Sequence, residues 1–408
     1  MRRRKRASRN PERPKVLFVI NSLGTGGAER SLAELLPGLA DAGIATVVVC
    51  LNRRREGVEE QVTRAGFDVR FLGAGGLFSR VRALRKIMKA ESPDMVHTTI
   101  FESDVAGRIA AVGSGAVVAT SLVNTTYDPV RLRNPRIRPW RLAAARTLDG
   151  WTARHLTDRF HAITAAVKEA SVSALGIGPE RVTVIERGRD PERLGTPGPE
   201  RRRRARAVLD LAEEDGVLVG VGRQEFQKGG RYLLEAMEML AEPRPVLLVA
   251  GRRGDASAEL ERLRERPALR DRVRFLGHRD DVPELLAAAD VFVFPSLYEG
   301  LGGAVIEAMA LGLPIVASDL PAIREVLEEG RNALLVEPGS STALAAALDE
   351  MVSDTDRARA FGTRSREIFE ERFTLERSTR RMVAWYRSAA GAGGLLADPS
   401  SEPVPERP

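Results

Sequence analysis

Residues 291–319 read VFVFPSLYEGLGGAVIEAMALGLPIVASD, and the fold prediction starts from the pattern in this stretch. An apolar run at 291–295 is followed by a glycine-rich turn and then by a helix pattern from Gly302 to a stop at Gly312. A second apolar run, 314–318, comes directly after the helix. A strand, a helix and another strand in this order predict a unit of a parallel sheet.

Apolar runs of the same kind recur along both halves of the 408-residue chain, with helix patterns between most of them. Their hydrophobicity is continuous rather than alternating, as in strands that are buried on both faces. The runs lie at 15–20, 45–51, 67–72, 94–98, 116–122, 160–164, 181–185, 216–221, 245–250, 273–276, 291–295, 314–318 and 333–336. We therefore predict an α/β protein with two tandem Rossmann-like, doubly wound domains and a cleft between them.

A segment rich in Pro, Gly and Arg interrupts the series at 190–215 and marks the predicted domain boundary. Within it, the arginine run 201–206 is expected to form the solvated face of a surface helix. The expected parts are a disordered basic arm at 1–13, an N-terminal Rossmann-like domain at 14–195, a C-terminal Rossmann-like domain at 196–363, a helix at 364–390 that packs back across the domain junction, and a disordered tail at 391–408.

The formal net charge of +7 is concentrated in the first residues of the chain. Residues 1–13 carry seven Lys or Arg and one Glu, whereas the body of the chain is nearly balanced. We therefore expect no nucleic-acid partner, and the arm is either a solvated tail or a contact to an anionic membrane surface. The single cysteine, Cys50, excludes a disulfide within one chain, and no apolar stretch is long enough to span a membrane. A cytoplasmic protein is expected, with a peripheral position at the inner membrane face left open.

A first candidate loop, NSLGTGGAERS at 21–31, lies between an apolar run and a helix pattern. Gly26 and Gly27 let the backbone approach a ligand and present N–H groups at a helix N-terminus, which is a good site for an anion. Glu29 stands where the dinucleotide fingerprint has its third glycine, which argues against a nicotinamide dehydrogenase. A tight turn without a ligand is the alternative.

A second candidate loop, GRQEFQKG at 222–229, directly follows the apolar run 216–221. Arg223 and Lys228 are five positions apart in this loop, which is flanked by glycines. Two cations that converge beyond a strand end suit a diphosphate, with Arg as a fork and Lys as a point charge. An ordinary solvated basic loop is the alternative.

The opening stretch places Glu299 and Glu307 on either side of Gly302 and Gly303. Glu307 is expected about 7 Å along the helix axis, at a rise of 1.5 Å per residue. A carboxylate accepts hydrogen bonds from two vicinal hydroxyls, and the helix N-terminus between the glutamates attracts an anion. A nucleotide-sugar has hydroxyls at both ends and a diphosphate between them, so the spacing fits this ligand class. Two surface glutamates beside a turn are the alternative.

These segments resemble a known family. EGLGGAVIEAMALGLPIVASD at 299–319 is similar to the donor signature of retaining glycosyltransferases of the GT-B fold, family 4. GRQEFQKG at 222–229 is similar to the Gly-Arg…Lys-Gly loop of that family, and GTGGAERS at 24–31 resembles its N-terminal glycine loop. The resemblance covers about residues 14–388. It implies that the domain at 14–195 binds the acceptor and that the domain at 196–363 binds the nucleotide-sugar.

The resemblance implies a role for each matching residue. Glu307 would hold the ribose hydroxyls of the nucleotide, Glu299 would contact hydroxyls of the transferred sugar, and Arg223 with Lys228 would neutralise the diphosphate. The residues that would lend backbone N–H groups are Gly302, Gly303, Gly26 and Gly27.

The resemblance also implies the reaction. The enzyme would move a sugar from a nucleotide-diphosphate-sugar to a hydroxyl of a glycan, a lipid-linked glycan or a small molecule, with retention and through front-face attack. No cofactor besides the donor and no metal ion would be required. The only Asp-x-Asp sequence, Asp354 and Asp356, follows a helix pattern and is expected to lie on the surface.

Two positions on the acceptor side are tentative. Many relatives carry a histidine after the strand that matches 116–122, whereas Asn124 stands here, and an amide cannot take a proton. His97 lies at a strand end, where it either faces the cleft or packs in the core. Relatives also often have an Asn-Gly-Val-Asp-like turn where this chain has Arg187 and Arg189.

The segment 125–160 mixes arginines with Trp140 and Trp151, a composition that suits a membrane surface or an anionic acceptor. We expect instead a helix that packs its tryptophans into the fold while its arginines face water. For the whole chain, a GT-B sugar-nucleotide epimerase, a phosphorylase and a non-catalytic nucleotide-sugar-binding protein remain alternatives to the transferase. The phosphorylase needs a pyridoxal lysine, for which the chain offers no second candidate besides Lys228.

Overall fold

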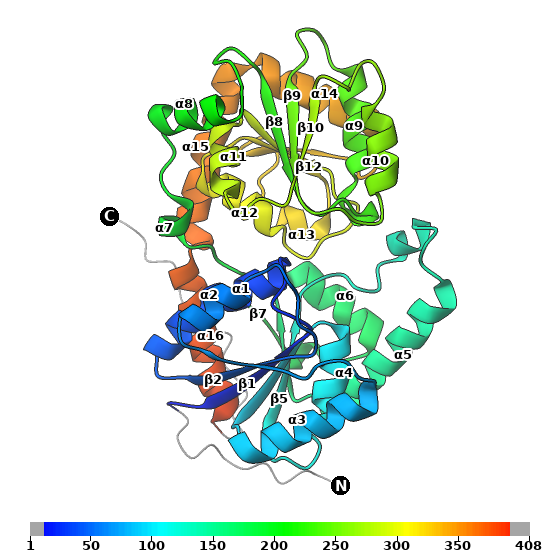
Figure 1. Cartoon of the computed structure of the whole chain (residues 1–408), viewed down its shortest axis with the longest axis vertical. Helices are drawn as coiled ribbons and strands as arrows, with labels where there is room; N and C mark the ends of the chain where they lie inside the picture. The colour runs from blue at the N-terminus through cyan, green and yellow to red at the C-terminus, as the bar shows by residue number, and fades with distance from the viewer. Residues whose placement is uncertain (1–11, 392–408) are drawn as a thin grey trace. The chain divides into compact units, whose positions relative to one another are not determined.

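The computed structural model describes residues 12–391, which form two compact α/β units (Figure 1). Unit 1 comprises residues 12–127, Arg138–Gly188 and 375–391, and unit 2 comprises Asp128–Ile137 and Arg189–Thr374. The arm predicted at 1–13 and the tail predicted at 391–408 lie almost entirely outside the described residues.

Unit 1 is built on a parallel sheet of seven strands in the order β3-β2-β1-β4-β5-β6-β7. The order reverses between β1 and β4, as in a doubly wound sheet. The strands are β1 (Lys15–Ile20), β2 (Ala45–Cys50), β3 (Asp68–Phe71), β4 (Met95–Thr99), β5 (Val117–Leu122), β6 (Arg159–Ala162) and β7 (Val182–Val184). The helices are α1 (Gly27–Asp41), α2 (Glu59–Arg64), α3 (Leu77–Glu91), α4 (Phe101–Ala110), α5 (Pro139–Leu156), α6 (Ala165–Leu175) and α16 (Leu375–Ala390), with the 3-10 turn η2 (Pro179–Arg181).

Unit 2 is built on a parallel sheet of six strands in the order β10-β9-β8-β11-β12-β13. Its strands are β8 (Val217–Val221), β9 (Val246–Ala250), β10 (Val273–Gly277), β11 (Val291–Phe294), β12 (Ile315–Ser318) and β13 (Ala333–Val336). Its helices are α7 (Pro191–Leu194), α8 (Pro199–Val208), α9 (Gly230–Met239), α10 (Ser257–Arg264), α11 (Val282–Ala288), α12 (Gly303–Ala310), α13 (Pro321–Arg324), α14 (Ser341–Ser353) and α15 (Thr355–Arg372), with 3-10 turns η1 (Pro129–Arg133) and η3 (Phe226–Lys228). Every predicted apolar run overlaps a strand, so the α/β fold prediction is confirmed.

Both faces of the central strands are buried, which explains their continuous hydrophobicity. In β1, Val16, Phe18 and Ile20 pack into one apolar cluster, whereas Leu17 and Val19 pack into another. Successive side chains of a strand point to opposite faces, so helices must cover both sides of the sheet. The first cluster includes residues of α1 and α16, and the second includes residues of α3 and α4.

The end of the chain differs from the single helix expected at 364–390. Helix α15 ends at Arg372 and belongs to unit 2, whereas α16 begins at Leu375 and belongs to unit 1. Within unit 1, α16 lies close against α1, because a Cβ added to Gly38 would stand 2.5 Å from Cγ2 of Thr379. Only a residue without a side chain permits this approach at position 38.

The arginine run 201–206 is not a uniformly solvated face. Arg206 is 1% exposed, its Nη1 donates to the carbonyls of Ala212 and Glu213, and its Nη2 lies 2.9 Å from Oδ2 of Asp290. The guanidinium therefore holds the loop that leads into β8, a role that charge patterning alone does not predict.

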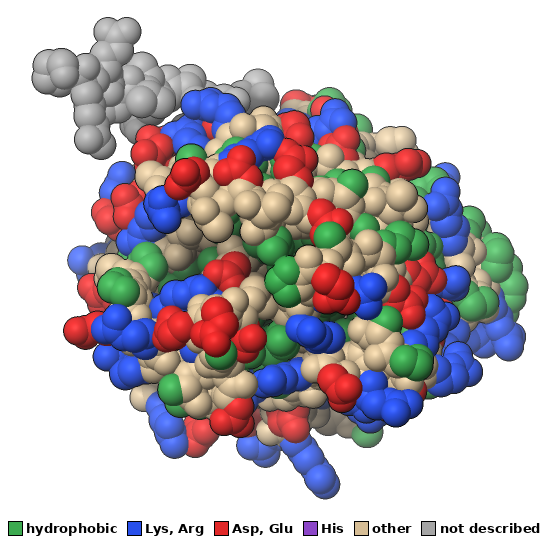
Figure 2. Space-filling view, turned by 90° about the horizontal axis from the view of Figure 1, so that it is seen from above, with side chains coloured by type: hydrophobic (Ala, Val, Ile, Leu, Met, Phe, Trp, Pro, Cys, Tyr) green, Lys and Arg blue, Asp and Glu red, His purple; other side chains and the backbone are tan. Residues whose placement is uncertain are grey.

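Charged side chains of both signs are interspersed over the face of the protein in Figure 2. No helix within residues 12–391 is long and apolar enough to cross a membrane.

Candidate active site

The loop between β11 and α12 in unit 2 holds Glu299, which is 9% exposed. Its Oε1 accepts hydrogen bonds from Nζ of Lys228, from Nε2 of Gln227 at 3.2 Å and from Oγ of Ser296 at 3.2 Å. Gln227 also donates to the carbonyl of Tyr298 at 2.9 Å. The carboxylate is thus held by one cation and two neutral donors, which keeps its position defined. Gln227 and Ser296 were not predicted, although Ser296 comes directly after a predicted strand.

Arg223 and Lys228 line the same small cavity of about 40 Å³ beyond β8, together with Ser296. The ammonium of Lys228 lies 5.1 Å from the ring centroid of Phe294, within the range of a cation–π contact. Arg223 is half-exposed, and its Nη1 lies 2.5 Å from Oε1 of Glu225. An exposed ion pair of this kind is worth about 0–1 kcal/mol, so a stronger anion can displace Glu225.

Glu307 is the fifth residue of α12 and is 3% exposed. Its Oε1 accepts from Nε of Arg189 at 2.9 Å, and Nη2 of Arg193 lies 3.5 Å from the same oxygen. The backbone N–H of Arg189 donates to the carbonyl of Phe373 at 2.8 Å, which anchors the arginine at its own main chain. Glu307 is therefore a buried, paired carboxylate rather than a surface glutamate.

The glycines at the starts of α12 and α1 differ in backbone conformation and in the space that their surroundings leave for a Cβ. Gly302 caps α12 with a φ of +80°, a left-handed conformation that favours glycine. A Cβ at Gly303 would stand 2.2 Å from Nη2 of Arg189, so the missing side chain makes room for that guanidinium. At α1, a Cβ on Gly26 would meet the carboxylate of Glu29, whereas Gly27 has open space around it.

His97 is 2% exposed, and both of its ring nitrogens are hydrogen-bonded. Nε2 of His161 donates to the carbonyl of Ile185 at 2.8 Å, so its Nδ1 accepts from the hydroxyl of Ser121 at 2.9 Å. Oγ of Ser121 then accepts from Nε2 of His97 at 2.8 Å, and Nδ1 of His97 accepts from the hydroxyl of Tyr386 at 2.5 Å. The donor and acceptor of every hydrogen bond in this buried series follow from the carbonyl of Ile185, which can only accept.

The remaining sequence candidates make local hydrogen bonds or lie on the surface. Asn124 is half-buried in the loop after β5, and its Oδ1 accepts from the backbone N–H of Thr125 at 2.8 Å. Asp354 caps α15 by accepting from the backbone N–H of Arg357 at 3.0 Å, and the side chain of Asp356 is 90% exposed. Within residues 12–391, no group of three or more His, Cys, Asp or Glu could hold a metal ion.

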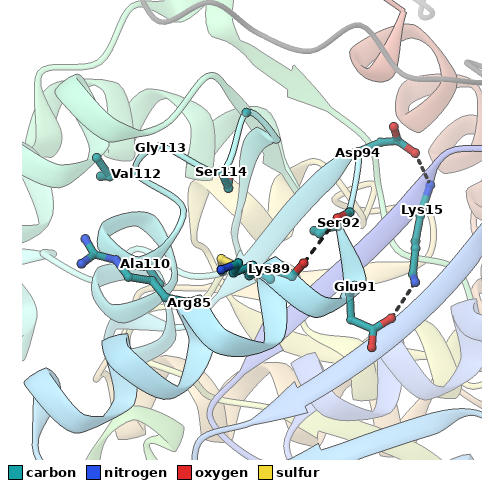
Figure 3. A pocket seen from close by; sticks show the side chains of 13 residues that line it. Lys15, Arg85, Lys89, Glu91, Ser92, Asp94, Ala110, Val112, Gly113 and Ser114 are labelled. Carbon is teal, nitrogen blue, oxygen red and sulfur yellow. Dashed lines mark hydrogen bonds and ion pairs between the residues drawn. The ribbon is translucent and has the colours of Figure 1, made fainter.

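A larger cavity of about 580 Å³ lies in unit 1, beside the start of β1 and the end of α3 (Figure 3). Figure 3 shows Lys15 between Glu91 and Asp94. Its Nζ donates to Oε2 of Glu91 at 2.6 Å, and its backbone N–H donates to Oδ2 of Asp94 at 2.8 Å. The cavity is away from the carboxyl ends of the strands, where ligands of such sheets bind, and none of the predicted site residues lines it. We assign it no function.

Comparison with solved structures defines the fold class as GT-B. The structure of Anabaena HepE in complex with UDP and glucose matches with a TM-score of 0.81 over 92% of this chain and 100% of that chain, at 23% identity. Relatives that are similar in sequence include two named enzymes. The α-maltose-1-phosphate synthase of Mycolicibacterium smegmatis is 28% identical over 90% of this chain and 96% of that protein. The UDP-Gal:α-D-GlcNAc-diphosphoundecaprenol α-1,3-galactosyltransferase of Escherichia coli is 28% identical over 62% of this chain and 65% of that protein.

Family models match both halves of the chain. The model described as Glycosyltransferase Family 4 matches residues 25–193, and the model described as Glycosyl transferases group 1 matches residues 201–368. The chain is therefore a glycosyltransferase and belongs to family 4, the glycosyl transferases group 1.

Proposed function

We propose that this glycosyltransferase moves a sugar from a nucleoside-diphosphate sugar to a hydroxyl acceptor, with retention of the anomeric configuration and without a metal ion. The observation that carries the proposal is the set of donors around Oε1 of Glu299, with Arg223 and Lys228 lining one cavity beside it. The UDP and glucose bound to HepE and the UDP-Gal in the name of the Escherichia coli relative support such a donor.

In the proposed reaction, the bond between C1 of the sugar and the diphosphate oxygen breaks. The bond between C1 and the acceptor oxygen forms on the same face, and the acceptor proton passes to the departing diphosphate. Lys228 has three N–H donors and gives one to Glu299, so the others can reach the diphosphate. Arg223 exchanges Glu225 for the same anion, and both cations stabilise the charge of the leaving group.

The two glutamates would bind the two ends of the donor. The three donors to Glu299 all reach Oε1, which leaves Oε2 to accept from hydroxyls of the transferred sugar. Glu307 would accept from the ribose hydroxyls while Arg189 holds its orientation. The N–H groups of Gly302 and Gly303 at the positive end of α12 would contact the diphosphate between them.

The acceptor would be bound by unit 1. Asn124 offers an amide to a hydroxyl of the acceptor or the sugar. Gly26 and Gly27, at the start of α1, would lend backbone N–H groups to the donor. The named activities of the relatives differ, so the proposal extends to the class of acceptor only: a glycan, a lipid-linked glycan or a small molecule.

Thermal-shift measurements with nucleoside diphosphates and their sugars test the donor site. We expect stabilisation by at least one diphosphate, lost in Arg223→Ala. Arg279→Ala is the matched control, because Arg279 pairs with an acid two positions on, just as Arg223 does, but does not line the cavity. A flat response across the panel contradicts the proposal, and so does equal loss in both variants.

The stereochemistry and the metal requirement are tested on the active enzyme. NMR of the anomeric proton at early times should show the donor configuration in the product. The turnover rate in EDTA should equal the rate in buffer alone. An inverted product would contradict retention, and a rate restored only by a divalent cation would contradict metal independence.

A further inference from the structure

The outward face of helix α5 carries large apolar side chains. Trp140, Leu148 and Trp151 are 63%, 40% and 51% exposed. Together with Ala144 they recur every three or four residues, so they form one stripe along the helix. The expectation that the tryptophans pack into the fold is wrong. Figure 1 shows α5 at the margin of unit 1.

The inward face of α5 is polar, which is why the tryptophans remain outside. Asp149 and Thr152 are buried, and Nη1 of Arg108 lies 2.6 Å from Oδ1 of Asp149 and 3.0 Å from Oγ1 of Thr152. The hydroxyl of Tyr127 donates to Oδ2 of Asp149 at 2.8 Å. Turning the helix to bury its tryptophans would take Asp149 and Thr152 away from the buried Arg108, whose contact with Asp104 is longer, at 4.0 Å. Each lost hydrogen bond to a charged group costs about 1.5–3 kcal/mol.

The exposed charged side chains of α5 itself, and of the residue before it, are all positive. Arg138 precedes the helix, and Arg141, Arg146 and Arg154 lie along it, all exposed, whereas the only acid of α5 is the buried Asp149. The guanidinium of Arg141 lies 5.2 Å from the ring centroid of Trp140. Tryptophan is enriched where a protein meets the headgroups of a membrane, and arginines attract anionic lipids at about 1 kcal/mol each.

We propose that the exposed face of α5 binds the surface of an anionic phospholipid bilayer. The tryptophans and Leu148 would enter the headgroup region while the arginines contact lipid phosphates. An apolar stripe without acids suits a lipid surface better than a second copy of this chain, whose own stripe would bring the same positive charges together. The inference concerns residues 138–155 rather than the arm at 1–13, and it does not depend on the identity of donor or acceptor.

The test uses the full chain and vesicles of phosphatidylcholine with or without phosphatidylglycerol. The chain has three tryptophans, and Trp385 is completely buried, so Trp140 and Trp151 report on vesicle contact. We expect co-sedimentation and a blue shift of the emission only when phosphatidylglycerol is present. The variant with Trp140→Ser and Trp151→Ser should bind at least about tenfold more weakly.

Charge variants separate a defined surface from general attraction. Arg141→Glu with Arg146→Glu should abolish sedimentation, whereas Arg203→Glu with Arg204→Glu on α8 makes the same charge change on another exposed arginine helix and should leave it intact. Equal loss in both pairs would overturn the proposal, as would equal binding to vesicles without phosphatidylglycerol. Self-association that disappears with the tryptophans, without any vesicle binding, would assign the face to a second copy. Unchanged stabilisation by a nucleoside diphosphate in every variant shows that the donor site is intact.

Discussion

Nε of Arg189 lies 2.9 Å from Oε1 of Glu307, and both side chains are almost completely buried, although 118 positions separate them in the chain. Arg189 stands two positions ahead of α7. Its guanidinium fills the space above Gly303 and holds the carboxylate that we assign to the ribose.

Arg189→Ala should destabilise the protein by about 1.5–3 kcal/mol, because it removes the 2.9 Å hydrogen bond to the buried carboxylate of Glu307 and leaves the longer contact with Arg193. Chemical denaturation measures this loss. Arg193→Ala is the control, since Arg193 is more exposed and 3.5 Å from the same oxygen, and it should cost less than about 1 kcal/mol. Equal losses in the two variants would show that Arg189 has no special role.

Gly303→Ala should be poorly tolerated, because its Cβ would stand 2.2 Å from Nη2 of Arg189 and force the guanidinium away from Glu307. Gly27→Ala also lies at the start of a helix but has open space, so it should be neutral or stabilising by up to about 1 kcal/mol. Melting temperatures of the two variants give the comparison. A stable Gly303→Ala protein would mean that Arg189 moves without cost.

Glu307→Ala should weaken nucleoside diphosphate binding by about tenfold or more, which corresponds to the loss of hydrogen bonds to a charged acceptor. Glu299→Ala should mainly lower kcat, because its proposed contacts are to the transferred sugar. Calorimetry with the diphosphate and steady-state kinetics separate the two effects. Unchanged diphosphate affinity in both Glu307→Ala and Glu307→Gln would disprove this division of roles.

Lys228→Met should lower kcat by about a hundredfold, because the ammonium stabilises charge on the leaving diphosphate and also holds Glu299. Lys15→Met removes another lysine–glutamate pair, between Lys15 at the start of β1 and Glu91. That variant should keep the wild-type kcat. Single-turnover rates are the measurement, and a wild-type rate in Lys228→Met would remove the lysine from the mechanism.

The buried hydrogen bonds that link His161, Ser121, His97 and Tyr386, here called the histidine chain, predict a loss of stability in acid. Burial lowers the pKa of His97 to about 3 and that of His161 to about 4, against about 6.5 in the unfolded chain. Below pH 6.5 the unfolded chain therefore binds more protons than the folded protein. Above pH 6.5 the histidines do not change the free energy of unfolding with pH. As the pH falls from 6.5 towards 3, the free energy of unfolding decreases by at most about 1.4 kcal/mol per pH unit for each histidine.

Asp104 changes the free energy of unfolding in the opposite direction over part of this pH range. Burial raises the pKa of its carboxyl to about 6, so the folded protein holds this proton more tightly than the unfolded chain does. Asp104→Asn therefore removes this opposing contribution from denaturation curves collected from pH 7 to pH 5. Ser121→Ala should cost about 2 kcal/mol at pH 7, because it leaves a ring nitrogen of His97 and one of His161 without a partner. If the free energy of unfolding of the Asp104→Asn protein did not change with pH, His97 and His161 would not be held neutral by the fold.

The local pattern of the sequence determined the strands, the two parallel sheets and the loops that carry Glu299 and Glu307. Burial on both faces imposes continuous hydrophobicity, and helix starts and stops require glycine or proline at known positions, so these features can be read without the fold. The place of Glu307 as the fifth residue of α12 followed from the same signals.

Only the tertiary structure decided which partners the polar residues have. The pairing of Arg189 with Glu307 and the burial of His97 depend on contacts between segments far apart in the chain, for which the sequence has no local signal. The exposure of Trp140 and Trp151 follows from an ion pair between Arg108 and Asp149 that turns the polar face of α5 inward. A helix has one inward face, and the pairing of buried charges outweighed the hydrophobicity of two tryptophans in setting it.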